Sequence, residues 1–447
     1  MKDSVTSRDE NVLAHAADMR AAARELFEHS LAEASVENAF RRHVDCERGV
    51  LRIREDLYDL SSFSRLFVVS IGKAAHTTLA ALQARAGDRF EGIVASSVEP
   101  ASQARGFRYF HGGHPQPNAD SVRGAEAVLK SLAAQNALSL IIYLLSGGGS
   151  SMLEKPIDEE ISLPDLIATY SALVLSGAPI AEINAIRKHL SAVKGGRLAQ
   201  AAYPAQQVSL LVSDVPDNTP DALASGPTMP DSTTAEECYA LATKYGLLEQ
   251  FPPSVRELFH RRVLAETPKS GDPAFQRSRW WTVSSNAAVL DACKTEAQRQ
   301  GWAVEIDNSC DDWDYACAAD YLLSRLREMR KKSARACLIS GGEVTVRVTN
   351  GGTGGRNQQF ALACAQKIAD QKITVLSAGT DGIDGNSSAA GAVVDGTTIS
   401  RARAKALDPE DFLKGFDAYP FFDALGDAVV TGPTGNNLRD LRILFAI

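Results

Sequence analysis

The amino-acid sequence predicts an α/β protein made of two domains, and three observations carry this prediction. The chain has 447 residues, which is more than one small hydrophobic core organises. Apolar, strand-like runs alternate with helical stretches in both halves, as in parallel sheets with helices packed on their faces. Glycine-rich segments follow several of the strands, at the edge where open α/β sheets bind ligands. We therefore expect two Rossmann-like α/β domains with a cleft between them.

The N-terminal half begins with a helix and continues with strand–helix units. Apolar residues at helical spacing from Met19 to Val44 predict a long amphipathic helix. Residues 65–82 pass from an apolar run through a glycine into an alanine-rich helical stretch, which is typical of a parallel sheet. Further apolar runs of this kind begin the segments 92–98, 107–129, 139–153 and 207–216.

A segment rich in proline, arginine and polar residues, 251–278, marks the predicted domain boundary. We place the first domain at residues 1–255, a linker at 256–274 and the second domain at 275–447. Strand and helix patterns resume after the boundary, at residues 280–306, 336–366, 373–385 and 441–447.

Composition and charge exclude several classes of protein. Hydrophobic residues make up 45% of the chain and charged residues 23%, as in soluble globular proteins. The net charge of −8 disfavours nucleic-acid binding, which needs a basic face. The seven cysteines form no C-x-x-C pair, the N-terminus lacks the apolar core of a signal peptide, and no apolar run is long enough for a membrane span. We expect a cytoplasmic protein, monomeric or homodimeric, whose partners are small molecules.

The segment SGGGSS places three glycines where a predicted strand ends. Successive backbone N–H groups in such a turn form a cradle for an anion, and the serine hydroxyls add further donors. The alternative is a tight turn that binds nothing. The chain contains neither the P-loop motif nor the dinucleotide-binding G-x-G-x-x-G motif, so a cradle here is of another kind. The predicted phosphate-binding residues are Ser146, Gly147, Gly148, Gly149, Ser150, Ser151 and, in a second segment, Ser225, Gly226 and Thr228.

Cations and carboxylates also lie at the ends of predicted strands. Lys73 and Arg356 come at the start of predicted helices, where a cation opposes the helix dipole unless an anion lies between them. Asp214 and Asp381 follow apolar strand residues. Fixed cations, strand-end aspartates and glycine cradles are the components of phosphoryl transfer, which needs charge neutralisation, a bridging Mg²⁺ and a group that orients the nucleophile. The sequence therefore predicts a phosphoryl-transfer enzyme.

Each of these residues has a predicted role. Lys73 contacts a transferring phosphoryl group or a substrate carboxylate, and Arg356 clamps an anion with its forked guanidinium. Asp214 is either the general base for the substrate hydroxyl or a Mg²⁺ ligand, and the sequence does not separate these two roles. Asp381 faces the same choice, and the metal role is favoured because Mg²⁺ prefers carboxylates that leave room for water and phosphates. Asp384 is interpreted as a turn residue.

Three further residues are predicted to bind a small carboxylic acid. Asn184 lies on a predicted helix beside basic residues, and Lys194 precedes a Gly-Gly break. Asn436 belongs to the last glycine-rich segment. His111 and His114 have the spacing of zinc ligands, but no second pair accompanies them, so we interpret them as structural.

Taken together, these motifs resemble the type II glycerate kinases (glycerate 2-kinases), whose C-terminal half is the MOFRL region. The matching stretches cover the chain from about residue 71 to its end: IGKAA, GGHPQPN, LLSGGGSSML, NAIRKHLSAVKGGRLA, SDVP with ASGPT, GGRNQQFALA, AGTDGIDG and GPTGNN with DLRI. The resemblance implies ATP- and Mg²⁺-dependent phosphorylation of D-glycerate, on the 2-hydroxyl to give 2-phospho-D-glycerate, in a cleft between two α/β domains. It also implies that Lys73, Asp214 and Arg356 are catalytic. Family members often carry Glu where this chain has Gln359, and some are labelled hydroxypyruvate reductases.

Two other hypotheses stay open. An NAD(P)H-dependent hydroxypyruvate reductase needs a dinucleotide site, and the missing fingerprint counts against it. A non-catalytic phosphosugar-binding protein uses serine-rich loops at strand ends in the same way. That second hypothesis leaves the strand-end residues Asp214 and Asp381 unexplained.

Overall fold

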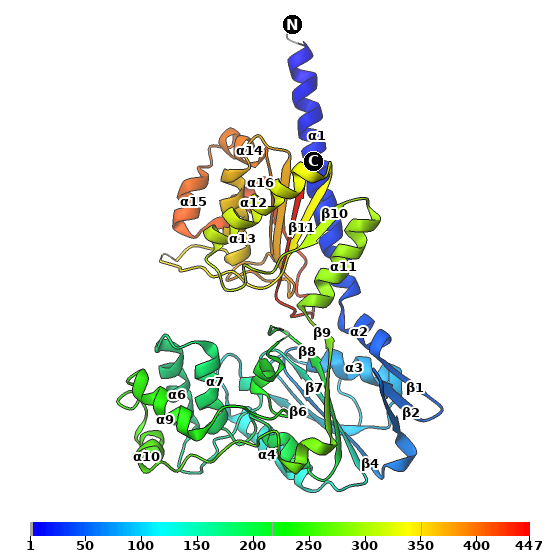
Figure 1. Cartoon of the computed structure of the whole chain (residues 1–447), viewed down its shortest axis with the longest axis vertical. Helices are drawn as coiled ribbons and strands as arrows, with labels where there is room; N and C mark the ends of the chain where they lie inside the picture. The colour runs from blue at the N-terminus through cyan, green and yellow to red at the C-terminus, as the bar shows by residue number, and fades with distance from the viewer. Residues whose placement is uncertain (1–2, 217, 350) are drawn as a thin grey trace. The chain divides into compact units, whose positions relative to one another are not determined.

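The computed structural model of the chain describes residues 3–216, 218–349 and 351–447, with side chains from residue 16 onward. The chain divides into two units, residues 36–283 and residues 1–35 with 284–447, which we call the first and the second unit. Each unit contains a six-stranded sheet with helices packed against it (Figure 1). The α/β class with two units is therefore confirmed.

The sheet of the first unit has the strand order of a Rossmann fold. Its strands are β6 (Phe107–His111), β5 (Glu91–Ser96), β4 (Arg65–Ile71), β7 (Ser139–Ser146), β8 (Gln206–Val212) and β9 (Ser278–Ser284), in that spatial order. The strands from β6 to β8 are all parallel. Counted along the chain this order is 3-2-1-4-5-6, and it reverses between β4 and β7. Ligands of doubly wound sheets bind at such a switch point, beside the carboxyl ends of the strands.

Hydrophobic burial explains why these segments form the central strands. All eight residues of β7 are buried, as expected for a parallel strand that is covered on both faces. The covering helices are α3 (Ala75–Ala86), α4 (Ala119–Ala133) and α8 (Arg197–Ala202). The start of α4 is fixed by a capping box between Asn118 and Ser121.

Two smaller structures complete the first unit. Four helices share a separate apolar cluster and lie together in Figure 1: α6 (Leu163–Leu175), α7 (Ile180–His189), α9 (Ala235–Lys244) and α10 (Pro253–Arg261). At the other end of the unit, α2 (Val36–His43) precedes a three-stranded antiparallel sheet, β1 (Val44–Glu47), β2 (Val50–Ile53) and β3 (Asp56–Asp59). Short helical segments are α5 (Gly149–Met152), η1 (Leu60–Ser62), η2 (Pro220–Ser225) and η3 (Pro273–Arg277).

The sheet of the second unit is mixed. Its strands are β10 (Ala303–Ile306), β11 (Ala336–Ser340), β15 (Asp440–Ala446), β12 (Ile373–Gly379), β13 (Gly391–Asp395) and β14 (Ala428–Val429), in that spatial order. The last strand, β15, lies between β11 and β12 and runs antiparallel to both. This insertion brings Asp440, at the start of β15, to the edge of the sheet where β12 ends.

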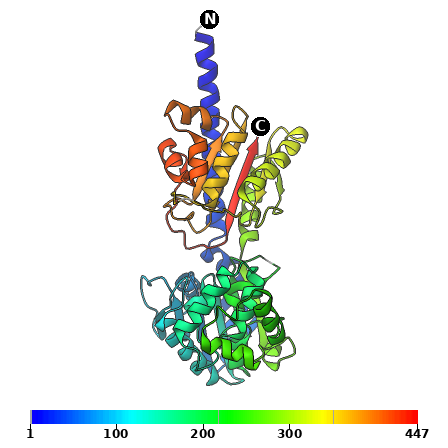
Figure 2. The ribbon, with the colours of Figure 1, turned by 90° about the vertical axis from the view of Figure 1, so that its left-hand side faces the viewer.

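Helices pack on both sides of this second sheet. The helices α12 (Tyr315–Lys332) and α13 (Arg356–Lys367) contribute to one large apolar cluster with the strands. The helices α1 (Asp3–Glu33) and α11 (Asn286–Arg299) pack on each other and on the sheet, and α1 runs along it in Figure 2. The remaining helices are α14 (Thr398–Ala404), α15 (Pro409–Gly415) and α16 (Ala418–Leu425).

The division into units differs from the expected one at both ends. The predicted N-terminal helix is two helices, and α1 belongs to the second unit, where Arg20 pairs with Asp395 and Asp427. The predicted linker, 256–274, belongs to the first unit, where Thr267 donates a hydrogen bond to Asp231 at 2.9 Å. The proline-rich, polar composition of this segment is typical of a linker. Its contacts with distant residues such as Asp231 cannot be seen in the local sequence, so the prediction missed them.

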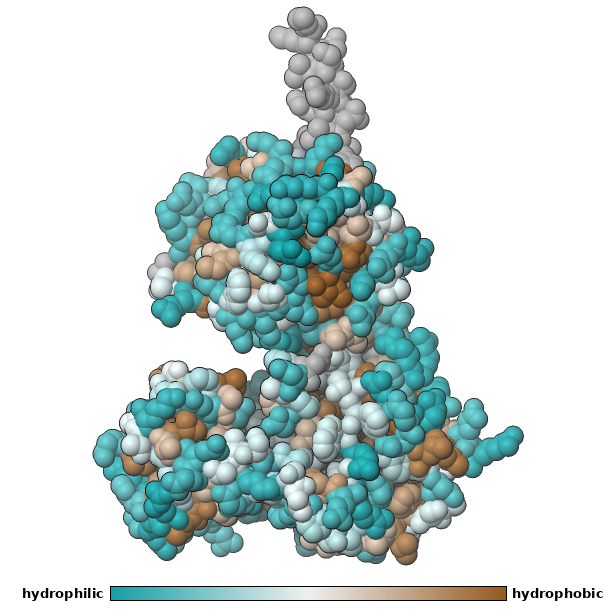
Figure 3. All heavy atoms as spheres, in the orientation of Figure 1, coloured by the Kyte–Doolittle hydropathy of each residue, from teal (hydrophilic) through white to brown (hydrophobic). Residues whose placement is uncertain are grey.

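The visible surface of both units is mainly hydrophilic, with scattered hydrophobic residues (Figure 3). Within the described part of the chain, no helix combines the length and the apolar character that crossing a bilayer requires.

Candidate active site

Two loops meet at the switch point of the first sheet. After β4 come Gly72 and Lys73, and after β7 comes the glycine run that starts at Gly147. The backbone N–H of Lys73 donates to the carbonyl of Gly147 at 2.9 Å, and that of Ala74 donates to Ser146 Oγ at 3.1 Å. Gly72 has a φ of +116°, and a Cβ there would lie 2.5 Å from the carbonyl oxygen of Ser146. The structure thus brings together the lysine and the glycine cradle that the sequence predicted.

Ser146 holds these loops together from inside the protein. Its side chain is buried, and its hydroxyl donates to the carbonyl of Ile71 at 3.2 Å while accepting from the N–H of Ala74. The predicted phosphate-binding hydroxyl is therefore engaged in joining the two strand ends. In this structure Ser146 supports the cradle.

We expect Ser146→Ala to lower the free energy of unfolding by about 1–3 kcal/mol, because it leaves the buried N–H of Ala74 without its acceptor. Urea unfolding measures this change, and Ser64→Ala, at an exposed serine of the same unit, is the control. Unchanged stability together with a weaker affinity for nucleotide would instead assign the hydroxyl to the ligand.

A third loop touches the glycine cradle. The hydroxyls of Ser150 and Ser225 lie 3.0 Å apart and hydrogen-bond. Ala224, Ser225 and Gly226 all have positive φ angles, of 50°, 59° and 60°. Such angles in two non-glycine residues are strained, and strain of this kind concentrates at functional sites. Thr228, also predicted to bind phosphate, is fully buried and accepts a hydrogen bond from Ser209 of β8, so it supports the loop from below.

Lys73 brings a positive charge to this site, and its side chain is exposed. His114 is near enough that burial and the Lys73 charge both lower the pKa of its imidazole, which keeps the ring neutral at pH 7. The same ring approaches Ser151, with Nδ1 3.3 Å from Oγ. His114 thus belongs to the site. The sequence analysis considered His114 only as a zinc ligand and then as a structural residue, so it missed this position beside Ser151 and Lys73.

Asp214 and Asn184 lie on elements that border these loops. Asp214 follows β8 by two residues and is half-buried, at the edge where β7 and β8 both end. Asn184 is half-exposed on α7, which packs against the segment 220–225. These positions keep both residues as candidates for the substrate side of the site.

Lys194 has a different environment from the predicted one. Its ammonium group is 1% exposed and forms an ion pair with Glu154. The same carboxylate accepts hydrogen bonds from Tyr170 at 2.7 Å and from Ser191 at 2.5 Å. Burial lowers the pKa of Lys194, while the charge of Glu154 acts against that shift. The ammonium is committed to this buried network, and its backbone neighbour Gly195 donates to the carbonyl of Ser225 at 3.0 Å.

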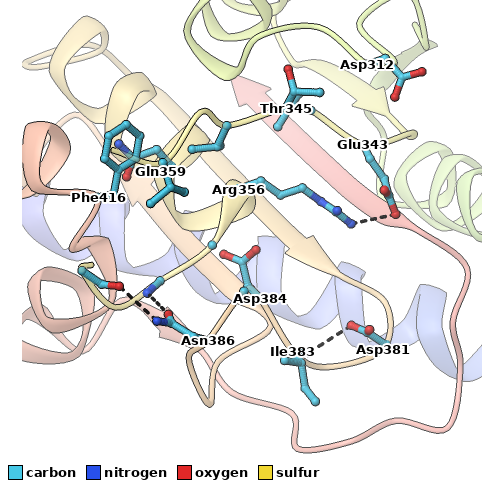
Figure 4. Close-up of a pocket in the computed structure, with 17 residues that line it drawn as sticks. Asp312, Glu343, Thr345, Arg356, Gln359, Asp381, Ile383, Asp384, Asn386 and Phe416 are labelled. Atoms are coloured by element: carbon cyan, nitrogen blue, oxygen red, sulfur yellow. Dashed lines mark hydrogen bonds and ion pairs between the residues drawn. The ribbon is translucent and has the colours of Figure 1, made fainter. Parts of the chain in front are cut away.

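In the second unit, Arg356 begins α13 and points into a pocket (Figure 4). Its guanidinium donates to both carboxylate oxygens of Asp440, at 2.7 and 3.0 Å, and lies 2.8 Å from the carboxylate of Glu343. Burial opposes the positive charge, but the hydrogen bonds and charges of Asp440 and Glu343 outweigh it and raise the pKa of Arg356. The guanidinium is therefore a permanent, oriented cation.

The pocket around Arg356 has a volume of about 700 Å³, within the range of small-molecule sites. Gly352, Gly354 and Gly355 are among the residues that line it. Its charged lining is mostly acidic, since Asp312, Glu343, Asp381 and Asp384 line it together with Arg356. Such a lining suits a ligand that carries both phosphates and a divalent cation.

Asp381 lines this pocket. One of its carboxylate oxygens accepts the N–H of Ile383 at 3.1 Å and so stabilises the turn that begins at Asp381. Across the described residues, no three histidine, cysteine or acidic side chains are grouped as a metal site. A Mg²⁺ ion at Asp381 would therefore take most of its ligands from water and from the phosphates of a nucleotide, which is the coordination Mg²⁺ commonly adopts. The donor set fits such an ion.

Asp384 is a buried cap of α13. It is 2% exposed, and its two oxygens accept the backbone N–H groups of Asn357 at 3.1 Å and Gln358 at 2.8 Å. Burial raises the pKa of Asp384 to about 7 against these hydrogen bonds. The carboxylate therefore does more than shape the turn that the sequence predicted.

Asn436 is also placed differently from the expectation. Its side chain is 6% exposed, and its amide donates to the carbonyl of Leu31 in α1 at 3.3 Å. The asparagine ties the last glycine-rich segment to the N-terminal helix, which leaves little of it for a substrate. Glu343 and Asp440, the partners of Arg356, were not predicted. A Gly-Gly-Glu sequence directly after β11 was the available signal for Glu343.

A Rossmann-ordered sheet with a lysine and a glycine run at its switch point, and a second unit with an arginine pocket, are features typical of α/β proteins that bind small anionic ligands. Two family models match the chain. "Domain of unknown function (DUF4147)" covers residues 22–260, and "MOFRL family" covers residues 336–440.

Curated relatives agree with these matches. The chain is 36% identical over 398 residues to the D-glycerate 2-kinase of Thermotoga maritima, covering 88% of this chain and 93% of that protein. It is 30% identical over 488 residues to the glycerate kinase of Homo sapiens, covering 95% and 92%. A protein of Agrobacterium vitis, 36% identical over 388 residues (85% of this chain, 87% of that one), carries a hydroxypyruvate reductase label.

A solved structure is similar over nearly the whole chain. The crystal structure of the glycerate kinase (EC 2.7.1.31) of Thermotoga maritima superposes with a TM-score of 0.84 at 33% identity, covering 96% of this chain and all of that one (100%). The chain therefore belongs to the glycerate kinase family that carries the MOFRL region.

Proposed function

We propose that this protein is a glycerate kinase, which transfers the γ-phosphoryl group of ATP to the 2-hydroxyl of D-glycerate and forms 2-phospho-D-glycerate. The observation that carries the proposal is the junction at the switch point, where the N–H of Lys73 bonds to Gly147 and sets a lysine beside a glycine cradle. The kinase names of the relatives support glycerate as the substrate.

The chemistry of the switch-point loops suits a phosphate chain. Lys73 comes just before α3, where its charge opposes the positive end of the helix dipole. A phosphate between them is attracted by both, and the backbone N–H groups of the glycine cradle add neutral donors. Ser150 and Ser225, which face each other, are the hydroxyls best placed to add to this cradle.

The remaining roles follow from charge and position. Arg356 stabilises the negative charge of the transferring phosphoryl group in the transition state. It does so as an oriented cation whose guanidinium is held by Asp440. Asp214 accepts the proton of the 2-hydroxyl or binds the metal, and Asp381 is the other candidate metal ligand. Asp214 and Asp381 would hold Mg²⁺, which would supply neutralisation of the phosphate charge when bound. Asn184 is proposed to contact the glycerate.

The test is ³¹P NMR of the purified protein with ATP, Mg²⁺ and D-glycerate, beside an optical assay with NADH and hydroxypyruvate. We expect a new phosphomonoester signal that matches 2-phosphoglycerate, and no oxidation of NADH. A 3-phosphoglycerate signal would keep the kinase and overturn the position of transfer. Intact ATP together with consumption of NADH would replace the proposal by the reductase. Tight binding of phosphosugars without either reaction would leave a binding protein.

A further inference from the structure

The arginine pocket contains a carboxylate to which the transfer chemistry assigns no role. Asp384 lies under the first turn of α13, and its two oxygens accept the N–H groups of the two residues that directly follow Arg356. Asn357 also turns its side-chain amide to the same carboxylate, at 3.3 Å. The orientation of this turn decides where the Arg356 side chain enters the pocket.

The surrounding chain is built to let the carboxylate reach this turn. A Cβ on Gly355 would lie 2.3 Å from Asp384 Oδ1, so only glycine leaves the space. Two residues beyond Asp384, Asn386 accepts the N–H of Gly354 at 2.8 Å and donates to the carbonyl of Gly352 at 3.1 Å. The segment 384–386 therefore clamps the glycine segment that leads into Arg356 (Figure 4).

We propose that Asp384 is a positioning residue for Arg356: it fixes the first turn of α13, from which the Arg356 side chain reaches Asp440. The inference rests on the proposed function, because it assigns Arg356 to the phosphoryl group. Asp384 itself touches backbone and Asn357, so it acts through Arg356 and not on the substrate.

The charge state of Asp384 sets the strength of this clamp. The ionised carboxylate accepts more strongly from both N–H groups, because protonation removes its charge and leaves one oxygen a weaker acceptor. The charged groups that face it are Arg356 from α13 and Asp440 from β15, with Glu343 next to Arg356. Desolvation and Asp440 favour the protonated form, and the two N–H groups and Arg356 favour the ionised form. The clamp therefore weakens as the pH falls below about 7.

The experiment is a double-mutant cycle of Asp384→Asn and Arg356→Ala, read as kcat/KM for phosphoglycerate formation. We expect Asp384→Asn to lower kcat/KM by about 10- to 100-fold, the cost of a small misplacement of a catalytic group. In the Arg356→Ala background the same change should cost less than about twofold, because the group it positions is gone. Asp314→Asn is the matched control, since Asp314 accepts two N–H groups at the exposed start of α12.

Each outcome decides the inference. Losses that multiply in the double variant, or no loss in Asp384→Asn, overturn it and leave Asp384 as an ordinary helix cap. The dependence of kcat/KM on pH is a second measurement, which a purely structural role of Asp384 would leave unchanged. The wild type should lose activity below about pH 7. If Asp384→Asn does not fold, the pH profile of kcat/KM is measured for Arg356→Ala instead. If Arg356→Ala also loses activity below about pH 7, the inference is overturned.

A failure of the proposed function gives a different result. If the wild type forms no phosphoglycerate, the kinase is wrong, and pyrophosphate serves as the anion probe in a thermal shift experiment. Stabilisation by pyrophosphate that is lost in both Arg356→Ala and Asp384→Asn, but kept in Asp314→Asn, upholds the positioning role. Stabilisation that survives Asp384→Asn, or none in the wild type, overturns it.

Discussion

Lys73→Ala is expected to lower kcat/KM for D-glycerate phosphorylation by about 10³-fold, the size of effect seen when a cation that stabilises a phosphoryl transition state is removed. The side chain of Lys73 is exposed, so the loss of stability should stay within about 0.5 kcal/mol. A coupled assay for ADP release and a thermal unfolding curve measure the two effects. Lys73→Arg should recover little activity, because a planar fork does not replace a point charge in a narrow cradle.

Lys130→Ala is the matched control, because Lys130 is an exposed lysine of α4 in the same unit. It should leave kcat/KM within about twofold, since its side chain is exposed on α4, outside the switch-point loops. If Lys73→Ala kept full activity, the switch-point loop would be a turn without a ligand. The kinase chemistry would then have to come from the pocket of the second unit.

The parts of the fold that sequence patterns predicted are those that depend on local order. An apolar run predicts a buried strand, and a glycine directly after such a run predicts where the strand ends. Both β7 and the end of β4 lie as expected. The pattern of the final strand, β15, is an apolar run as well, but it carries no information on direction. Only pairing with β11 and β12 shows that it enters the sheet antiparallel. The packing of α1 on the second unit is likewise a long-range contact.

The same distinction separates the site residues. Lys73, Gly147 and Arg356 lie at strand ends and helix starts that the sequence displays directly, so their positions could be predicted. Lys194 and Asn436 do not, because their partners lie 40 and 405 residues away along the chain, at Glu154 and Leu31. A buried partner of this kind cannot be predicted from the spacing of charges. Because of such a partner, a residue that the sequence predicts to bind a ligand instead stabilises the fold.

Lys194→Met tests this stabilising role, and we expect it to lower the free energy of unfolding by about 3–5 kcal/mol, the cost of leaving a buried charge without its partner. The Glu154 carboxylate would lose its cation and keep as donors the hydroxyls of Tyr170 and Ser191 and the backbone N–H of Lys155. Urea unfolding measures the change. Because Gly195 and Gly196 hold the strained loop at Ser225 and Gly226, turnover should fall together with stability.

The double variant Lys194→Met/Glu154→Gln separates support from ligand binding. A neutral glutamine still accepts the hydroxyl of Tyr170 and no longer needs a cation, so most of the lost stability should return. If Lys194 only supports the loop, turnover returns with it, and KM for D-glycerate stays near the wild-type value. Recovered stability with KM raised more than about tenfold would contradict this conclusion. Lys194 would then bind the substrate carboxylate, as its place before the Gly-Gly break first indicated, and the ion pair with Glu154 would have to open when glycerate binds.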